Sequence, residues 1–280
     1  MNNFQKPDSA NLTTIEPKQD WSLGDLLELW SYRELVLVMI TRDIKVRYKQ
    51  TVMGLAWAII QPLTMMLIFT LIFSTLAKIP SNGFPYPVFV FSGMLAWNFF
   101  STSVSTAGIS LISSSNLVSK VYFPRIIIPI ASLGVSLVDF CISAGLLLIL
   151  MLIYGQALSS TILFVPFFML GLIIVSLGLG SWLAAITVTY RDFRYVIAYL
   201  LQIWMYLTPV IYPISFVPES WRWVLYLNPI YGWVNGIRAC FLGQPFDWLG
   251  IAISTVLSLL ILMIGLFYFE KAQRRFADVI

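Results

Sequence analysis

Long stretches without a charged side chain constrain this chain more than any other feature. A bilayer core is about 30 Å thick and needs roughly 20 apolar residues per helix. Six windows of the sequence come within a few residues of that length: 54–77, 87–112, 126–154, 162–188, 195–212 and 249–269. The sequence therefore predicts an all-α integral membrane protein with six transmembrane helices.

Composition supports the same fold class. Hydrophobic residues make up 59% of the chain and charged residues 11%, which leaves too little polar surface for a water-soluble protein of 280 residues. The first forty residues carry no pattern of a cleaved signal peptide, so the first span is expected to remain as an anchor. We divide the chain into a polar, flexible N-terminus (1–20), an amphipathic helix region (21–51) and a six-helix transmembrane domain (52–280).

Basic residues predict the orientation in the membrane. If all six windows span, 14 of the 17 Lys and Arg residues lie on one side, and only Lys78, Arg222 and Arg238 lie on the other. Because Lys and Arg concentrate in cytoplasmic loops, both termini are predicted to be cytoplasmic.

The segment before the first span alternates apolar and basic residues. Arg42, Lys45 and Lys49 are spaced i, i+3 and i+7, which places them on one face of a helix. Such a helix is expected to lie in the inner membrane interface with four apolar residues toward lipid: Leu35, Leu37, Ile40 and Ile44. Two interpretations stay open. The cations either fix the topology, or they also bind an anionic group such as a pyrophosphate carried on a lipid.

The loop between the fifth and sixth windows, residues 213–248, is rich in tryptophan and tyrosine. Pro218 can begin a helix, Asn228 and Pro229 can interrupt it, and Gly243 can end a second helix. Two pieces of roughly 10 and 13 residues would be too short to cross a bilayer. We interpret them as a re-entrant helical hairpin on the outer face, and a simple aromatic belt at the interface is the alternative.

Two charged features interrupt the apolar sequence. Lys120, Arg125 and Pro124 fall between the second and third windows and predict a short cytoplasmic turn over residues 116–125. Asp139 is the one ionisable residue inside any window. Because no intramembrane cation accompanies it in the windows, interhelical hydrogen bonding is favoured over a role in transport.

Several chemistries are excluded. The chain has no histidine, which removes His-based acid–base catalysis and most zinc sites, and it has no phosphate-binding loop for ATP. Its two cysteines, Cys141 and Cys240, suggest neither a disulfide framework nor a metal cluster. No pair of carboxylates in one loop has the spacing of metal ligands, because the outer side offers only Glu219 and Asp247 and the inner loops only Asp192. We therefore expect no metal site and no enzymatic activity.

Six segments of the chain resemble the membrane subunit of ABC type-2 exporters, most of all the permeases for O-antigen, capsule and teichoic-acid polysaccharides. They are RDIKVRYKQTVMGLAWAIIQP (42–62), LVSKVYFPR (117–125), TYRDFRY (189–195), TPVIYP (208–213), NPIYGWVNGIR (228–238) and KAQRRFADVI at the end. The resemblance extends over residues 22–280.

This resemblance implies a homodimer in the bacterial inner membrane that works with a separate ATPase. ATP and magnesium would be bound by the ATPase, and this chain would bind no cofactor. The turn would dock on the ATPase through seven residues: Ser119, Lys120, Val121, Tyr122, Phe123, Pro124 and Arg125. Four cations would lie where a lipid pyrophosphate enters: Arg42, Lys45, Arg47 and Lys49. The outer hairpin would form a gate and a glycan path through six residues: Trp221, Trp223, Tyr226, Tyr231, Trp233 and Arg238.

The expected function is therefore export of a polysaccharide linked to undecaprenyl pyrophosphate, driven by the partner ATPase. A type-2 permease for a drug or another small amphiphile is the first alternative. A membrane-bound transferase acting on lipid-linked sugar is the second, and it would require an acidic or histidine site that the sequence does not offer.

Overall fold

The computed structural model describes residues 30–49, 54–273 and 276, and within these ranges every regular element is a helix. The predicted polar N-terminus (1–20) and most of the final KAQRRFADVI motif lie outside the described residues. The predicted all-α fold class is confirmed for the described part of the chain.

Within the described residues, five helical segments are long and apolar enough to span a membrane. They are α3 (Gly54–Phe69) continued by the π-helix η1 (Thr70–Leu76), α4 (Tyr86–Ser113), α6 (Ile127–Ile153), the short 3₁₀ helix η2 (Ser160–Phe164) continued by α7 (Val165–Thr189), and α11 (Trp248–Gln273). Each coincides with one of the six predicted windows to within a few residues.

The predicted fifth span is shorter than expected. The window 195–212 contains α8 (Phe193–Leu207), whose 15 residues measure about 22 Å at the helical rise. The helix ends because Thr208 precedes Pro209, and a residue before proline is pushed toward extended backbone, as the Thr208 ψ of 137° shows. The six-span count therefore stays a prediction, as does the orientation of the termini.

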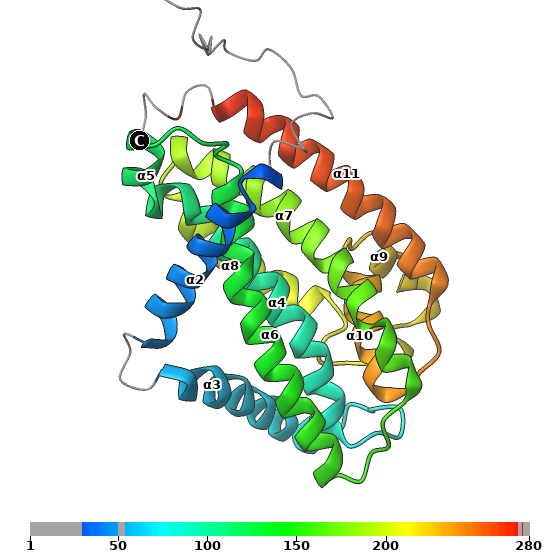
Figure 1. Cartoon of the computed structure of the whole chain (residues 1–280). Helices are drawn as coiled ribbons and strands as arrows, with labels where there is room; N and C mark the ends of the chain where they lie inside the picture. The colour runs from blue at the N-terminus through cyan, green and yellow to red at the C-terminus, as the bar shows by residue number, and fades with distance from the viewer. Residues whose placement is uncertain (1–29, 50–53, 274–275, 277–280) are drawn as a thin grey trace, which may run out of the picture.

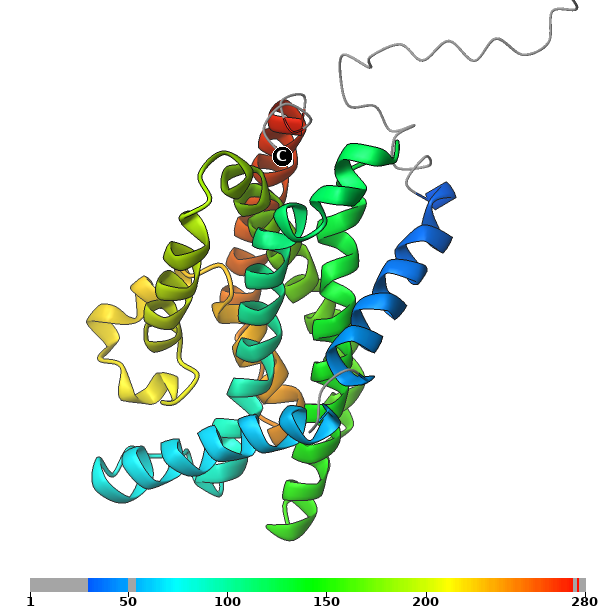
Figure 2. The same ribbon diagram turned by 90° about the vertical axis from the view of Figure 1, so that its left-hand side faces the viewer.

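Helix α4 is the centre of the bundle and packs against α6, α7 and α10 (Figure 1). In the most apolar part of α4, 78% of the residues are buried, against 17% in the α3–η1 segment. Figure 2 shows α3 running across the other long helices and extending beyond them. The core of the molecule therefore forms around α4, while α3 contributes little to it.

Small residues allow α7 and α11 to pack at close range. A Cβ atom added to Gly265 would lie 2.1 Å from the carbonyl oxygen of Gly178, and one added to Gly178 would lie 2.6 Å from the Cα of Leu262. Close backbone contact through glycine is a common way for membrane helices to associate, because lipid provides no hydrophobic force between them.

The aromatic segment after α8 is folded into short helices at the predicted breaks. It contains the 3₁₀ turns η3 (Ile214–Phe216) and η4 (Glu219–Trp221), followed by α9 (Arg222–Tyr226) and α10 (Tyr231–Leu242). Asn228 and Pro229 separate α9 from α10, and Gly243 ends α10 with a φ of +67°. Every residue of α10 is buried, so α10 is part of the core, whereas most of η3, η4 and α9 is exposed. A re-entrant position in the membrane stays a prediction.

Helix α2 (Arg33–Lys49) lies along the first half of α6 (Figure 2). Leu35 and Ile40, which the sequence assigned to lipid, instead pack against protein, and a Cβ atom added to Gly134 of α6 would lie 2.6 Å from Ile40. That prediction was wrong for these two residues because a single helical stripe does not distinguish lipid from a neighbouring helix. Leu37 is exposed, as expected.

Candidate functional site

A cavity of about 430 Å³ lies between α2, α4 and α6. Helix α2 contributes Arg42, Asp43 and Arg47 to its wall. The other two helices contribute hydroxyl groups, from Thr106, Ser110 and Ser113 of α4 and from Ser132 of α6. Each of these hydroxyls donates to a carbonyl oxygen of its own helix, which leaves the two guanidinium groups as the charged donors of the cavity.

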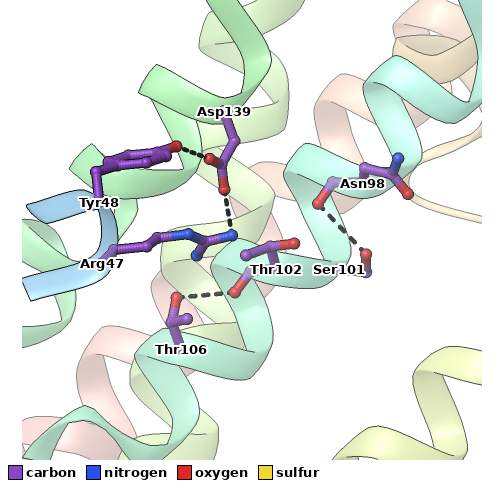
Figure 3. Close-up of polar contacts among 7 residues, drawn as sticks. All are labelled: Arg47, Tyr48, Asn98, Ser101, Thr102, Thr106 and Asp139. Carbon is purple, nitrogen blue, oxygen red and sulfur yellow. Dashed lines mark hydrogen bonds and ion pairs between the residues drawn. The ribbon is translucent and has the colours of Figure 1, made fainter. Parts of the chain in front are cut away.

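Arg47 pairs with the carboxylate in the middle of α6. Its Nη2 atom lies 2.7 Å from Asp139 Oδ2, and the Tyr48 hydroxyl donates to Asp139 Oδ1 (Figure 3). Asp139 therefore makes the interhelical contact that the sequence favoured. Its partners are Arg47 and Tyr48 of α2.

The other predicted cations of α2 are placed differently. Arg42 lines the same cavity as Arg47 and pairs with Asp43 at 2.8 Å. Lys45 and Lys49 are exposed and do not line the cavity. The structure therefore brings two of the four predicted cations together at one cavity.

A strip of polar residues on α4 was missed by the sequence analysis. Asn98, Ser101, Thr102 and Thr106 follow one another along α4 (Figure 3), and all four are partly buried. Thr106 lines the cavity that holds Arg47, and the others continue along the helix away from it. The i, i+3 and i+4 spacing of these residues within an apolar window is the signal that predicts such a strip.

The residues predicted to dock on an ATPase, 119–125, begin at the end of the short helix α5 (Ser115–Lys120). Ser119, Lys120 and Val121 are exposed, and Tyr122 is 81% exposed. These four residues form a free edge at the end of the bundle where α6 begins, so they are available to a partner.

The last three residues of this segment are held by the fold. Phe123 is buried in the same hydrophobic cluster as Phe269 of α11 and Phe276, and Pro124 is half-buried. Arg125 donates to the carbonyl oxygen of Gln273, and its guanidinium lies 5.9 Å from the ring centre of Phe276. Burial lowers the pKa of Arg125 from its usual value, although an arginine remains charged at neutral pH.

The six residues predicted for the outer gate divide into two groups. Trp221 and Trp223 are exposed, and Tyr226 is half-buried with its ring edge against Tyr231. Tyr231, Trp233 and Arg238 are buried, so in this conformation they belong to the core and do not line an open path. Tyr231 donates to Asp247 at 2.7 Å, and the Trp233 indole donates to Ser258 at 2.9 Å.

One asparagine joins the end of α8 to the start of α10. Asn228 accepts from the Trp204 indole at 3.1 Å and donates from Nδ2 to the Thr208 hydroxyl at 2.9 Å. It also accepts from the backbone N–H of Ile230 at 3.2 Å. These contacts fix the position of the aromatic segment against α8.

Long apolar helices around a buried central helix, with a basic cavity and an exposed short helix near the same end, define a multi-pass membrane protein suited to transport. The ABC-2 type transporter family matches residues 34–242, and the chain belongs to that family. It is a multi-pass inner-membrane permease.

Curated relatives match nearly their whole length. The chain is 32% identical over 256 residues to the O-antigen export system permease protein RfbA of Myxococcus xanthus, covering 90% of this chain and 98% of that protein. It is 25% identical to RfbA of Klebsiella pneumoniae, covering 94% and 99% of the two chains. It is 24% identical to the polysialic acid transport protein KpsM of Escherichia coli, covering 85% and 93%.

Proposed function

We propose that this chain is the membrane subunit of an exporter for lipid-linked polysaccharide. The observation that carries the proposal is the similarity to the M. xanthus O-antigen permease over 98% of that protein. The similarity to a polysialic acid transporter favours a glycan over a drug or another small amphiphile.

The cavity between α2, α4 and α6 is proposed as the place where the lipid pyrophosphate enters. Arginine binds phosphate oxygens through two parallel N–H groups, and Arg42 and Arg47 both line this cavity. Their present partners, Asp43 and Asp139, are carboxylates that a pyrophosphate can replace. Lys45 and Lys49 would attract the headgroup from the surface, because both are exposed on the same helix.

A separate ATPase is proposed to drive the cycle. The sequence has no phosphate-binding loop, so ATP and magnesium would be bound by that partner. Its contact would be the exposed edge of Ser119, Lys120, Val121 and Tyr122, on the cytoplasmic side with both termini.

The functional unit is proposed to be a homodimer. The resemblance to type-2 exporters, which implies two copies of the permease, supports this, and the weakly buried α3 is the surface proposed for the contact between them. The aromatic segment from η3 to α10 would close the outer end of each copy as a re-entrant gate. ATP binding by the partner would separate the helix bundles of the two copies and open this gate.

The deciding experiment is a deletion strain complemented with the parent chain or with Arg42→Gln/Arg47→Gln. Surface polysaccharide is followed on gels, and lipid-linked glycan is measured inside the cell. We expect the deletion to lose surface glycan and accumulate the lipid-linked form, and the double variant to restore export only weakly. Lys45→Gln/Lys49→Gln serves as the control, with a smaller effect.

Other outcomes would support the rival functions. Normal surface glycan with new sensitivity to toxins would favour a permease for small amphiphiles. Product formation by the purified chain without ATP, abolished by changing Asp192, Glu219 or Asp247, would favour a transferase.

A further inference from the structure

A second cavity, of about 540 Å³, lies far from the arginines of α2. It is formed by the loop before α4, the segment after α8 and the C-terminal end of α10 with the loop that follows. Figure 1 places these segments at the end of the bundle opposite α5. Its wall combines aromatic rings, from Phe84, Phe89 and Phe246, with four polar side chains, from Asn82, Asn235, Gln244 and Asp247, and with Arg238.

Arg238 carries a buried charge without a counterion. Its side chain is 1% exposed, and among the described residues no carboxylate lies within ion-pair distance of it. One guanidinium nitrogen donates to the Val210 carbonyl oxygen, while Nε has no partner, and the guanidinium lies 4.2 Å from the ring centre of Phe89. Burial lowers its pKa only to about 10, so the group is charged at neutral pH. A buried charge without a counterion is costly unless a ligand completes the site.

Two amides of the same cavity also lack partners. Asn235 is 9% exposed, and neither it nor Gln244 forms a side-chain hydrogen bond within the part of the chain that the structure describes. Gln244 is partly exposed, and the polar atoms of both amides are open to the cavity, so both side chains can donate to and accept from a ligand there. Asp247 is different, because it already accepts from Tyr231 and from the Gly250 backbone at 2.7 and 3.0 Å.

We propose that this outer cavity binds a sugar unit that bears a carboxylate. Aromatic rings beside amides suit a sugar ring with its hydroxyl groups. The carboxylate supplies the negative charge that Arg238 lacks, and the cavity has the size of a small-ligand site. This inference rests on the proposed function, since it names the chemistry of one unit of the exported glycan.

The test measures binding to the full chain in lipid nanodiscs by saturation-transfer NMR. The probes are methyl glucuronide, methyl glucoside, which lacks the carboxylate, and inorganic phosphate. We expect glucuronide to bind roughly tenfold more tightly than glucoside, because a hydrogen bond to a charged group is worth that factor. Phosphate should not displace it at equal concentration.

Two variants locate the site. Asn235→Asp places a negative charge beside Arg238 and should weaken glucuronide binding roughly tenfold, while Gln244→Ala should weaken it by about threefold. Gln202→Ala is the matched control, because Gln202 is an exposed amide on α8 outside the cavity. Melting temperatures verify that each variant is folded.

Equal affinity for glucuronide and glucoside would overturn the proposal, and so would displacement by phosphate, insensitivity to both variants, or no binding of any probe. The measurement needs neither ATP nor export. If no probe binds but the deletion strain still loses surface glycan, only the acidic-sugar site is removed. A deletion strain with normal surface glycan would instead remove the proposed function.

Discussion

The Arg47 guanidinium lies 2.7 Å from the Asp139 carboxylate and joins the helix before the first span to the middle of α6. A carboxylate at mid-membrane costs about 2.5–3.5 kcal/mol unless it is paired or hydrated. Asp139 is paired here, and it also accepts a hydrogen bond from Tyr48. The pair therefore anchors α2 to the bundle and holds Arg47 at the wall of the inner cavity.

Neutralising this carboxylate is expected to destabilise the protein. Asp139→Asn keeps the size of the side chain and removes the charge partner of Arg47, for an expected cost of about 1–2 kcal/mol, because both groups are partly exposed and the pair is screened. The measurement is thermal unfolding in detergent. Asp43→Asn, which breaks the exposed Arg42–Asp43 pair, is the control and should cost about 0.5 kcal/mol or less.

A double-mutant cycle isolates the pair itself. Arg47→Met and Asp139→Leu should be non-additive by about 0.5 kcal/mol or more, because the two residues are in contact. Strict additivity would show that the ion pair does not stabilise the position of α2.

The long helices were predictable because their lengths follow from bilayer thickness. Pro218, Asn228 with Pro229, and Gly243 also marked real breaks, since backbone geometry at proline and glycine is a local property. The contact between Arg47 and Asp139 was not predictable, because the two residues are far apart in sequence. Each also fits a pattern of its own, Arg47 as part of a basic helix and Asp139 as a hydrogen-bonding residue inside a span.

Buried aromatic residues of the outer segment show a second limit. The sequence assigned Trp233 to a glycan path, but it packs in the core against Gly171, where an added Cβ would lie 2.4 Å from the indole. The number of tryptophans in a loop does not show which of their rings pack against a glycine on another helix and which stay exposed. The end of α8 before Pro209 follows, in contrast, from a local rule that the sequence displays, because the residue before a proline is pushed toward extended backbone.

Loss of the Asn228 side chain should loosen the aromatic segment. Asn228→Ala removes contacts to Trp204, Thr208 and the Ile230 backbone, and it should lower the free energy of unfolding by about 2–3 kcal/mol at roughly 1 kcal/mol per hydrogen bond. Thermal unfolding in detergent measures the change. Asn116→Ala, at an exposed site on α5, should leave the melting temperature unchanged, and equal effects of the two variants would contradict this role.

Substitutions at the exposed edge of Ser119, Lys120, Val121 and Tyr122 should weaken the contact with the partner ATPase and leave the stability of the permease unchanged. Lys120→Glu and Tyr122→Ala are expected to reduce co-purification of the ATPase and its stimulation by the permease several-fold, with an unchanged melting temperature, because both side chains are exposed. Arg125→Glu should instead lower the melting temperature, since Arg125 contacts Gln273 and Phe276. Normal ATPase coupling in both edge variants would remove this surface from the interface.

Alanine substitution of two glycines is expected to change the melting temperature differently, because one glycine lies at the close contact of α7 with α11 and the other meets no neighbouring atom. Gly265→Ala would place a methyl group 2.1 Å from the Gly178 carbonyl oxygen, and neither backbone can move without separating the helices. Overpacking of this kind costs about 1–3 kcal/mol, so the variant should have a clearly lower melting temperature. Gly145→Ala in α6 is the matched control, because an added Cβ meets no atom within 4 Å, and alanine is the better helix former. We therefore expect Gly145→Ala to be neutral or stabilising. Equal melting temperatures for the two variants would mean that α7 and α11 do not pack through these glycines.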